Sequence, residues 1–212
     1  LYQIALATGM RQSEILALKW SDLDWKLKTI SVVRQLERNP KSKENYFSKV
    51  KTDAGRRKIK LGDLTIEKLR AHMKSQSEER MSLARGKWDE NDLIFPSIVG
   101  TPMNQSNLYR HFKETLVKAG LEETRFHDLR HTAASLMLNH GVPAIVVSKR
   151  LGHSKVSITL DIYGHLIQEM QDGAAEMIDD LITPIEISDV GFDINCTPTS
   201  LNCTPIEINH ES

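Results

Sequence analysis

Short helices separated by helix stops fill the second half of the sequence, and this pattern restricts the fold more than any other feature. Between residues 104 and 182, apolar side chains recur at helical spacing in one segment after another. Gly141 and Gly152 each follow a periodic segment, where glycine commonly ends a helix, and Pro143 stands where proline commonly begins one. The predicted helices cover 104–119, 127–140, 143–151 and one or two stretches within 156–182.

The first half of the chain mixes helices and strands. Residues 1–19 predict two helical pieces with a turn at Thr8-Gly9, and residues 28–36 are rich in the β-branched side chains typical of a strand. Residues 46–61 predict a hairpin that turns at TDAG. The remaining segments are a polar turn at 39–45, a helix at 64–80 and a short apolar run at 93–97. We therefore predict an α+β fold, mainly α-helical with a small antiparallel β-sheet or hairpin.

Length and composition indicate a globular protein. The 212 residues are 40% hydrophobic and 26% charged, which allows one sizeable domain with its own core. No apolar run approaches the roughly 18 residues of a membrane-spanning helix, so no membrane partner is expected. We assign residues 1–182 to one domain and 183–212 to a flexible tail. In that tail TPIEI and NCTP each occur twice. These repeats indicate a tether or a peptide ligand, with chance repetition as the alternative. The chain opens within a helical pattern, so we expect an upstream segment.

Charge is unevenly distributed along the chain. All 28 Lys and Arg lie before residue 172, whereas nine of the 28 acidic residues lie within 172–212, so residues 1–171 carry a net charge of +9. A basic body is compatible with a polyanionic partner. Both cysteines, Cys196 and Cys203, lie near the C-terminus. No disulfide framework therefore holds the core, which predicts a reducing compartment such as the cytoplasm.

The helix start in RFHDLRH, at 125–131, carries the strongest chemical signal. His127 and Arg130 are three positions apart, so they share a helix face and can reach one ligand. The free N–H groups of a helix N-terminus favour anions. The segment therefore predicts an oxyanion or phosphate site, with incidental basic residues at a helix start as the alternative.

Other segments supply further side chains suited to a phosphate. Arg11 in TGMRQSE follows a glycine turn, and Glu14 one helical turn later can position its guanidinium. LGHS places His153 at a helix junction, SITLDIYGHL supplies Tyr163, and VKTDAGRRKIKL carries Lys51 near the predicted hairpin turn. In this order and spacing, the segments resemble the catalytic domain of the tyrosine recombinases, the family of phage and conjugative-transposon integrases. The resemblance runs from residue 1 to about residue 180.

The resemblance implies a role for each of these residues. Arg11 and Arg130 would hold the scissile phosphate, with Glu14 supporting Arg11. The remaining catalytic positions would be Lys51 in the hairpin, the histidines His127 and His153, and the nucleophile Tyr163. Family members often carry a second lysine two positions after the first, where this sequence has Asp53. Lys49 therefore remains an alternative to Lys51.

These residue types suit the cleavage of a phosphodiester. Arginines stay charged at any working pH and can hold both non-bridging oxygens, and their charge favours the ionised form of a nearby phenol. The resemblance implies that DNA is cut and rejoined through a 3′-phosphotyrosyl intermediate without a metal, ATP or another cofactor. Lys51 would protonate the leaving 5′ oxygen, His127 would assist the proton transfers of Tyr163, and His153 would hydrogen-bond the phosphate.

Double-stranded DNA is the predicted partner. Basic side chains that meet backbone phosphates position DNA without specifying its sequence; the candidates are Lys19, Lys49, Arg56, Arg57, Lys58, Arg110 and Lys113. An apolar stripe at helical spacing either packs on the chain's own core or docks on a neighbouring protomer, in a homo-oligomer that the resemblance suggests is a tetramer on DNA. The stripe consists of Ile167, Met170, Ala174, Met177, Ile178 and Leu181.

Three alternatives stay open from the sequence. A type IB topoisomerase would use the same chemistry to relax supercoils, and a non-catalytic DNA-binding derivative would keep the residues without the reaction. A metal-dependent hydrolase would instead use His127, His131, His153 and His165. The neighbouring arginine would repel the cation of such a hydrolase, and the carboxylates do not follow a known ligand spacing.

Overall fold

The structure is a computed structural model that describes residues 1–50, 52–83, 88–164, 178–179 and 181–182. The chain divides into two compact units, Leu1–Gln171 and Asp172–Ser212. The predicted tail at 183–212 lies outside the described residues. No helix within the described ranges is long and apolar enough to cross a membrane.

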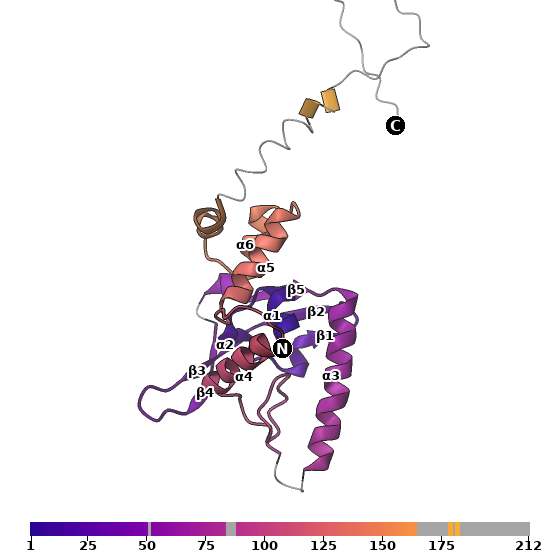
Figure 1. The fold of residues 1–212 in the computed structure, drawn as a ribbon, viewed down its shortest axis with the longest axis vertical. Helices are drawn as coiled ribbons and strands as arrows, with labels where there is room; N and C mark the ends of the chain where they lie inside the picture. The colour runs from indigo at the N-terminus through magenta and orange to yellow at the C-terminus, as the bar shows by residue number, and fades with distance from the viewer. Residues whose placement is uncertain (51, 84–87, 165–177, 180, 183–212) are drawn as a thin grey trace, which may run out of the picture. The chain divides into compact units, whose positions relative to one another are not determined.

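The first unit is α+β and mainly helical, as predicted. In chain order it contains α1 (Tyr2–Thr8), α2 (Gln12–Ile15), the 3-10 turn η1 (Trp20–Asp22), β1 (Leu23–Asp24), β2 (Thr29–Val32), β3 (Arg34–Arg38), β4 (Asn45–Lys49), the 3-10 turn η2 (Asp53–Gly55), β5 (Arg57–Lys60), α3 (Asp63–Ser82), α4 (Gln105–Lys118), α5 (Asp128–Asn139) and α6 (Ala144–Leu151). Residues 156–164 are also helical. In Figure 1, α5 and α6 lie together at one end of this unit, and α3 runs along the side where β1 lies. The helices predicted from the second half are confirmed where they are described, with ends within a residue or two.

The strand pairing differs from the predicted hairpin over 46–61, which is wrong. β4 pairs with β3, whereas β5 pairs with β2, and β2 also pairs with β1, all antiparallel. The connection that the sequence indicated as a polar turn is the true hairpin turn, where the Asn39 N–H donates to the Glu44 carbonyl oxygen at 2.8 Å. The apolar run at 28–36 is split between β2 and β3, which belong to different sheets. Lys51 lies outside the described residues.

Two apolar clusters hold the unit together. The larger cluster joins α1, α2, the three-stranded sheet, α3 and α4, and it includes Ile15, Ile30 and Ile94, each 0% exposed. The smaller cluster joins α5, α6 and the helical residues 156–164; its buried members are Ala134, Leu138, Val147, Leu151 and Tyr163. Helix α1 packs on α5, so the ends of α1, α5 and α6 meet.

A glycine permits this close approach. Gly9 ends α1 in the left-handed conformation, with φ of 64°, which glycine adopts at little cost. A Cβ atom on Gly9 would lie 2.5 Å from Cδ2 of Leu151. The glycine turn predicted between α1 and α2 therefore brings the backbone before Arg11 against the end of α6.

Candidate active site

Arg130 lies at the junction of α1, α5 and α6. Its side chain is buried, and its Nη1 donates hydrogen bonds to the carbonyl oxygens of Gly9 at 2.7 Å and Leu151 at 2.8 Å. Both acceptors are backbone groups at helix ends, where carbonyls lack a helical partner. Burial, followed by the charge of Arg11, lowers the pKa of Arg130 to about 10. The guanidinium therefore stays positive at neutral pH and is fixed in place.

Glu14 holds the second arginine. Its side chain is 1% exposed, and its oxygens accept hydrogen bonds from Arg11 Nη1 at 3.0 Å and from the Arg11 backbone N–H at 2.9 Å. Arg57 donates to the same carboxylate at 2.8 and 3.2 Å. Burial alone raises the pKa of Glu14, but the hydrogen bonds and charges of Arg57 and Arg11 outweigh burial, and the pKa is lowered. The ionised carboxylate thus positions Arg11, as the resemblance implied.

Arg57 forms a buried ion pair inside the fold. This corrects the prediction that Arg57 contacts a DNA phosphate. Its side chain is 7% exposed, and beyond Glu14 it donates to the Arg150 carbonyl oxygen at 2.7 Å and the Gly55 carbonyl oxygen at 3.0 Å. A Cβ atom on Gly152 would lie 2.6 Å from Arg57 Nη1. Arg57 stands two positions before the buried Ile59 in β5. The two-residue period of a strand puts both on one face, a signal that could have predicted burial of Arg57.

His153 lies two residues after the end of α6. Its Nδ1 contacts the hydroxyl of the fully buried Thr159 at 2.8 Å, and this contact fixes the ring from one nitrogen. Burial, followed by the charges of Arg130 and Arg11, lowers the pKa of His153 to about 4. At neutral pH the imidazole is therefore uncharged beside two arginines, a form that can still donate a hydrogen bond.

Tyr163 contacts a histidine to which the sequence had assigned no role in this site. Its hydroxyl lies 2.7 Å from Nδ1 of His131, and the phenol is 4% exposed. Burial raises the pKa of Tyr163, while the charge of Arg130 acts in the opposite direction. The His127 ring packs edge-on against His131, with ring centroids 5.1 Å apart. His127, which precedes α5, and His131 are four residues apart, and this spacing in the sequence indicated that their side chains share one helix face.

The predicted site residues thus share one neighbourhood. The charges of Arg11, Glu14 and Tyr163 all contribute to the pKa shift of Arg130. The charge of Arg130 in turn lowers the pKa values of His127 and His153. Burial and then the charges of His131 and Arg130 lower the pKa of His127. Lys51 is outside the described residues, so its place in this neighbourhood stays a prediction.

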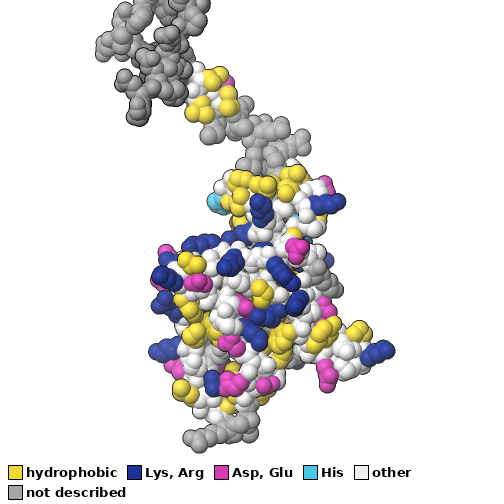
Figure 2. All heavy atoms as spheres, turned by 180° about the vertical axis from the view of Figure 1, so that it is seen from behind, with side chains coloured by type: hydrophobic (Ala, Val, Ile, Leu, Met, Phe, Trp, Pro, Cys, Tyr) yellow, Lys and Arg dark blue, Asp and Glu magenta, His cyan; other side chains and the backbone are white. Residues whose placement is uncertain are grey.

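Other basic residues predicted to meet DNA lie at the surface. Lys49, Arg56 and Lys58 are exposed, and Lys19 lies over the Phe47 ring, 5.5 Å from its centroid. On α4, Lys113 pairs with Glu123 at 2.8 Å, and Arg110 donates to Asn107 at 3.4 Å. Figure 2 shows Lys and Arg side chains spread over one face of the first unit, next to the end formed by α5 and α6.

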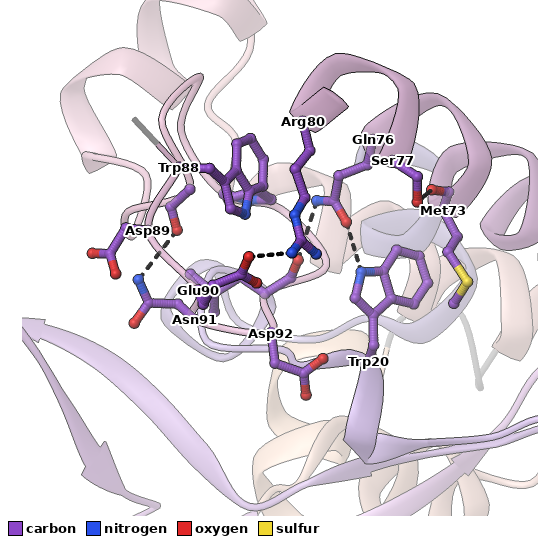
Figure 3. Close-up of a pocket in the computed structure, with 13 residues that line it drawn as sticks. Trp20, Met73, Gln76, Ser77, Arg80, Trp88, Asp89, Glu90, Asn91 and Asp92 are labelled. Carbon is purple, nitrogen blue, oxygen red and sulfur yellow. Dashed lines mark hydrogen bonds and ion pairs between the residues drawn. The ribbon is translucent and has the colours of Figure 1, made fainter. Parts of the chain in front are cut away.

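A separate pocket of about 340 Å³ lies between α3 and the segment at 88–93 and includes none of the predicted site residues. In Figure 3, Arg80 reaches Glu90 across it, and Trp20 Nε1 donates to Gln76 Oε1 at 2.7 Å. The carboxylates of Asp89, Glu90 and Asp92 line this pocket, so it would repel a phosphate. Among the residues that the structure describes, no group of three or more His, Cys, Asp or Glu side chains could hold a metal ion.

Known structures share this fold. The Tn1549 transposon integrase in complex with transposon right end DNA aligns with a TM-score of 0.64 and 25% identity, over 82% of this chain and 57% of that one. XerA recombinase aligns with a TM-score of 0.55 and 24% identity, over 86% of this chain and 55% of that one. The fold is that of a tyrosine recombinase catalytic domain.

The chain belongs to the phage integrase family, whose family model matches residues 1–170. A XerC-like tyrosine recombinase from Caldanaerobacter subterraneus subsp. tengcongensis is 34% identical over 85% of this chain and 49% of its own length. The ICEBs1 integrase of Bacillus subtilis is 29% identical over 85% of this chain and 48% of its own length. The chain therefore spans about half the length of these relatives.

Proposed function

We propose that this chain cleaves and rejoins DNA strands in site-specific recombination, through a 3′-phosphotyrosyl intermediate on Tyr163. The observation that carries the proposal is the position of the Tyr163 phenol, within electrostatic reach of the buried Arg130 and in contact with His131. Membership of the phage integrase family supports it. No metal or nucleotide is required, because the phosphoester energy is conserved in the covalent linkage.

The charged and polar groups divide the work of this reaction. Arg11 and Arg130 would hold the non-bridging oxygens of the phosphate and stabilise the charge that develops in the transition state. The neutral imidazole of His153 would add a hydrogen bond. Lys51, with Lys49 as the alternative, would protonate the leaving 5′ oxygen, and His127 would assist the proton transfers of Tyr163.

Double-stranded DNA would contact the exposed basic side chains of the first unit. The exposed side chains of Lys49, Arg56 and Lys58 support such contacts. Lys19, Arg110 and Lys113 are further candidates, although each also contacts another side chain of the chain. The Tn1549 integrase structure is a DNA complex, which supports the same partner here. Because each neutralised phosphate releases counterions, binding should weaken steeply with salt.

Further copies of the chain would assemble with it into a tetramer on DNA, in the cytoplasm. Ile178 and Leu181 of the predicted stripe are 55% and 69% exposed, while its other members lie outside the described residues. Aliphatic side chains are exposed on α5, α6 and residues 156–164, where a neighbour's stripe could dock; they are Leu136, Ile145, Val146, Leu160 and Ile162. Unpaired apolar side chains of this kind favour a protein partner.

The decisive experiment is trapping on a nicked suicide DNA substrate, followed by denaturing electrophoresis, with chelator present. The parent chain should form a covalent adduct, Tyr163→Phe should form none, and Tyr109→Phe, at an exposed tyrosine of α4, should behave as the parent. Adduct on Tyr163→Phe would show that the nucleophile is another residue. Retarded DNA without adduct would indicate a binding derivative. Relaxation of supercoiled plasmid without exchange between paired sites would indicate a topoisomerase.

A further inference from the structure

The end of helix α6 holds three arginines through its main chain. Consecutive carbonyl oxygens of this helix end each accept a hydrogen bond from a different guanidinium. The pairs are Arg57 Nε with the Arg150 oxygen at 2.7 Å, Arg130 Nη1 with the Leu151 oxygen at 2.8 Å, and Arg11 Nη2 with the Gly152 oxygen at 3.5 Å. Carbonyl groups at a helix C-terminus lack a helical partner and carry partial negative charge, so they suit cationic donors. Two of these arginines, Arg11 and Arg130, are the ones assigned to the phosphate.

The side chain of Arg150 ties this helix end to two other elements. Its Nη2 donates to the carbonyl oxygen of Ala7, in the last turn of α1, at 2.7 Å. The same nitrogen donates to the carbonyl oxygen of Lys60, the last residue of β5, at 3.0 Å. The tie to β5 is reciprocal, because the Arg57 side chain of β5 donates to the Arg150 main chain. One side chain therefore holds the end of α6 against both α1 and β5.

We propose that Arg150 is a positioning residue for the two arginines that hold the phosphate. The proposal rests on the proposed function, in which Arg11 and Arg130 neutralise the scissile phosphate. Arg150 keeps the carbonyl oxygens of Leu151 and Gly152 in the places where these two guanidiniums meet them. It acts through the main chain of α6, so its own contact with DNA is not required.

The adjacent carbonyl groups make this arrangement sensitive to small movements. Because the acceptors are consecutive in the chain, a shift of the α6 end moves them together, and Arg11 and Arg130 lose their alignment at the same time. A misplacement of about 1 Å at a reacting group can cost about 10²-fold in rate. Arg11 is also held by Glu14, and Arg130 is also held by the Gly9 carbonyl oxygen. The expected effect is therefore a change in the orientation of the two cations and not the loss of either one.

A neutral substrate tests whether a variant is defective in holding the phosphate charge. The nicked suicide substrate is made with a methylphosphonate at the cleavage position that the parent adduct defines. A methyl group then replaces one non-bridging oxygen, and the group carries no charge. On the phosphodiester, Arg150→Met should lower the single-turnover rate constant by about 10²-fold with DNA binding retained. On the methylphosphonate, the same variant should lose less than about tenfold, because the arginines have less charge to neutralise.

Three further variants complete this comparison. Arg130→Lys, which alters a phosphate-binding arginine directly, should show the same relief on the methylphosphonate. Lys149→Met, at the preceding and exposed position of α6, should match the parent on both substrates. Arg150→Lys keeps a cationic donor on a different stem, so its rate constant should lie between those of Arg150→Met and the parent. The rate constant is compared and not the amount of adduct, because unfolded protein lowers the amount and leaves the rate constant of the folded fraction unchanged.

A second arm follows the Arg130 guanidinium without DNA. NMR of isotope-labelled arginine in the parent should show Arg130 guanidinium protons that exchange slowly with water, because main-chain oxygens hold them. Arg150→Met should remove this protection. The signal of Arg34, which pairs with Asp22 in another part of the fold, should stay unchanged and serves as the internal control.

The outcomes separate this proposal from the proposed function. An unchanged rate constant of Arg150→Met on the phosphodiester, or equal losses on the two substrates, would overturn the positioning role while the proposed function stands. Unchanged proton exchange at Arg130 would overturn it as well. If the parent chain forms no adduct, the proposed function fails and the role of Arg150 falls with it, whatever the exchange at Arg130 shows.

Discussion

Arg57 on β5 and Glu14 on α2 form a buried ion pair, in which two guanidinium nitrogens lie 2.8 and 3.2 Å from the carboxylate oxygens. The same carboxylate holds Arg11, and the same guanidinium holds the Arg150 carbonyl oxygen in α6. The three-stranded sheet therefore fixes both the first arginine of the site and the end of the helix that precedes His153.

Replacing Arg57 should destabilise the fold. Arg57→Met leaves the Glu14 carboxylate, 1% exposed, with Arg11, whose side chain is 42% exposed. Removing one partner of a buried pair leaves an uncompensated charge, which costs about 3–5 kcal/mol. We expect the free energy of unfolding in urea to fall by about 3 kcal/mol. Lys58→Met, at the next and exposed position, should change it by less than about 0.5 kcal/mol.

A double variant tests the pairing itself. Glu14→Gln combined with Arg57→Met removes both charges, so the combined loss should be smaller than the sum of the single losses. Additive losses would show that Arg57 acts through its packing alone.

The close approach at Gly9 gives a second prediction. Gly9→Ala meets both a left-handed backbone, with φ of 64°, and the Leu151 side chain at 2.5 Å. Gly141→Ala meets a similar backbone, with φ of 78°, but nothing lies within 4 Å of its added Cβ. The backbone cost of about 1–2 kcal/mol is common to both variants, so overpacking should make Gly9→Ala worse by at least about 1 kcal/mol. Equal unfolding free energies would contradict the contact.

His153 should make stability depend on pH. Its pKa is lowered from 6.5 to about 4 in the fold, so the unfolded chain binds a proton more readily. The resulting stability is fully present above pH 6.5 and is lost as pH falls through about 4. An NMR titration of the His153 ring should give a midpoint near 4, and His153→Gln should flatten the pH dependence of urea unfolding in that window. A midpoint near 6.5 would contradict the structure.

Arg130 should not be replaceable by lysine. Nη1 alone bonds both the Gly9 and Leu151 carbonyl oxygens, so the rest of the planar fork can face a phosphate. A lysine ammonium keeps the charge but cannot reproduce that geometry. Arg130→Lys should slow single-turnover cleavage by about 10²–10³-fold with DNA binding retained. Arg125→Lys, at an exposed arginine paired with Asp128, is the control, and equal rates for the two variants would contradict the role of the fork.

The sequence predicted local structure better than long-range pairing. Helices α3 to α6 were recognised because periodicity, Pro143 and Gly152 are local signals. The predicted hairpin was wrong because β5 pairs with β2, and the β3–β4 ribbon lies between these two strands in the sequence. The residues of one strand do not indicate which distant strand it pairs with. Local spacing places Arg57 and His131 on one face of their elements but does not identify the groups that they contact. Arg57 contacts Glu14 in α2 and the end of α6, and His131 contacts a phenol that lies 32 positions later.

The acceptors that hold Arg130 are main-chain oxygens, and a main-chain oxygen survives every coded substitution at its own position. An alanine scan can therefore remove the Arg130 side chain, but it cannot remove either of the two oxygens that hold it. Only chemistry that alters the peptide link itself, such as an ester in place of the amide, would expose that dependence. These two contacts of Arg130 are thus hidden from a survey that uses coded substitutions alone.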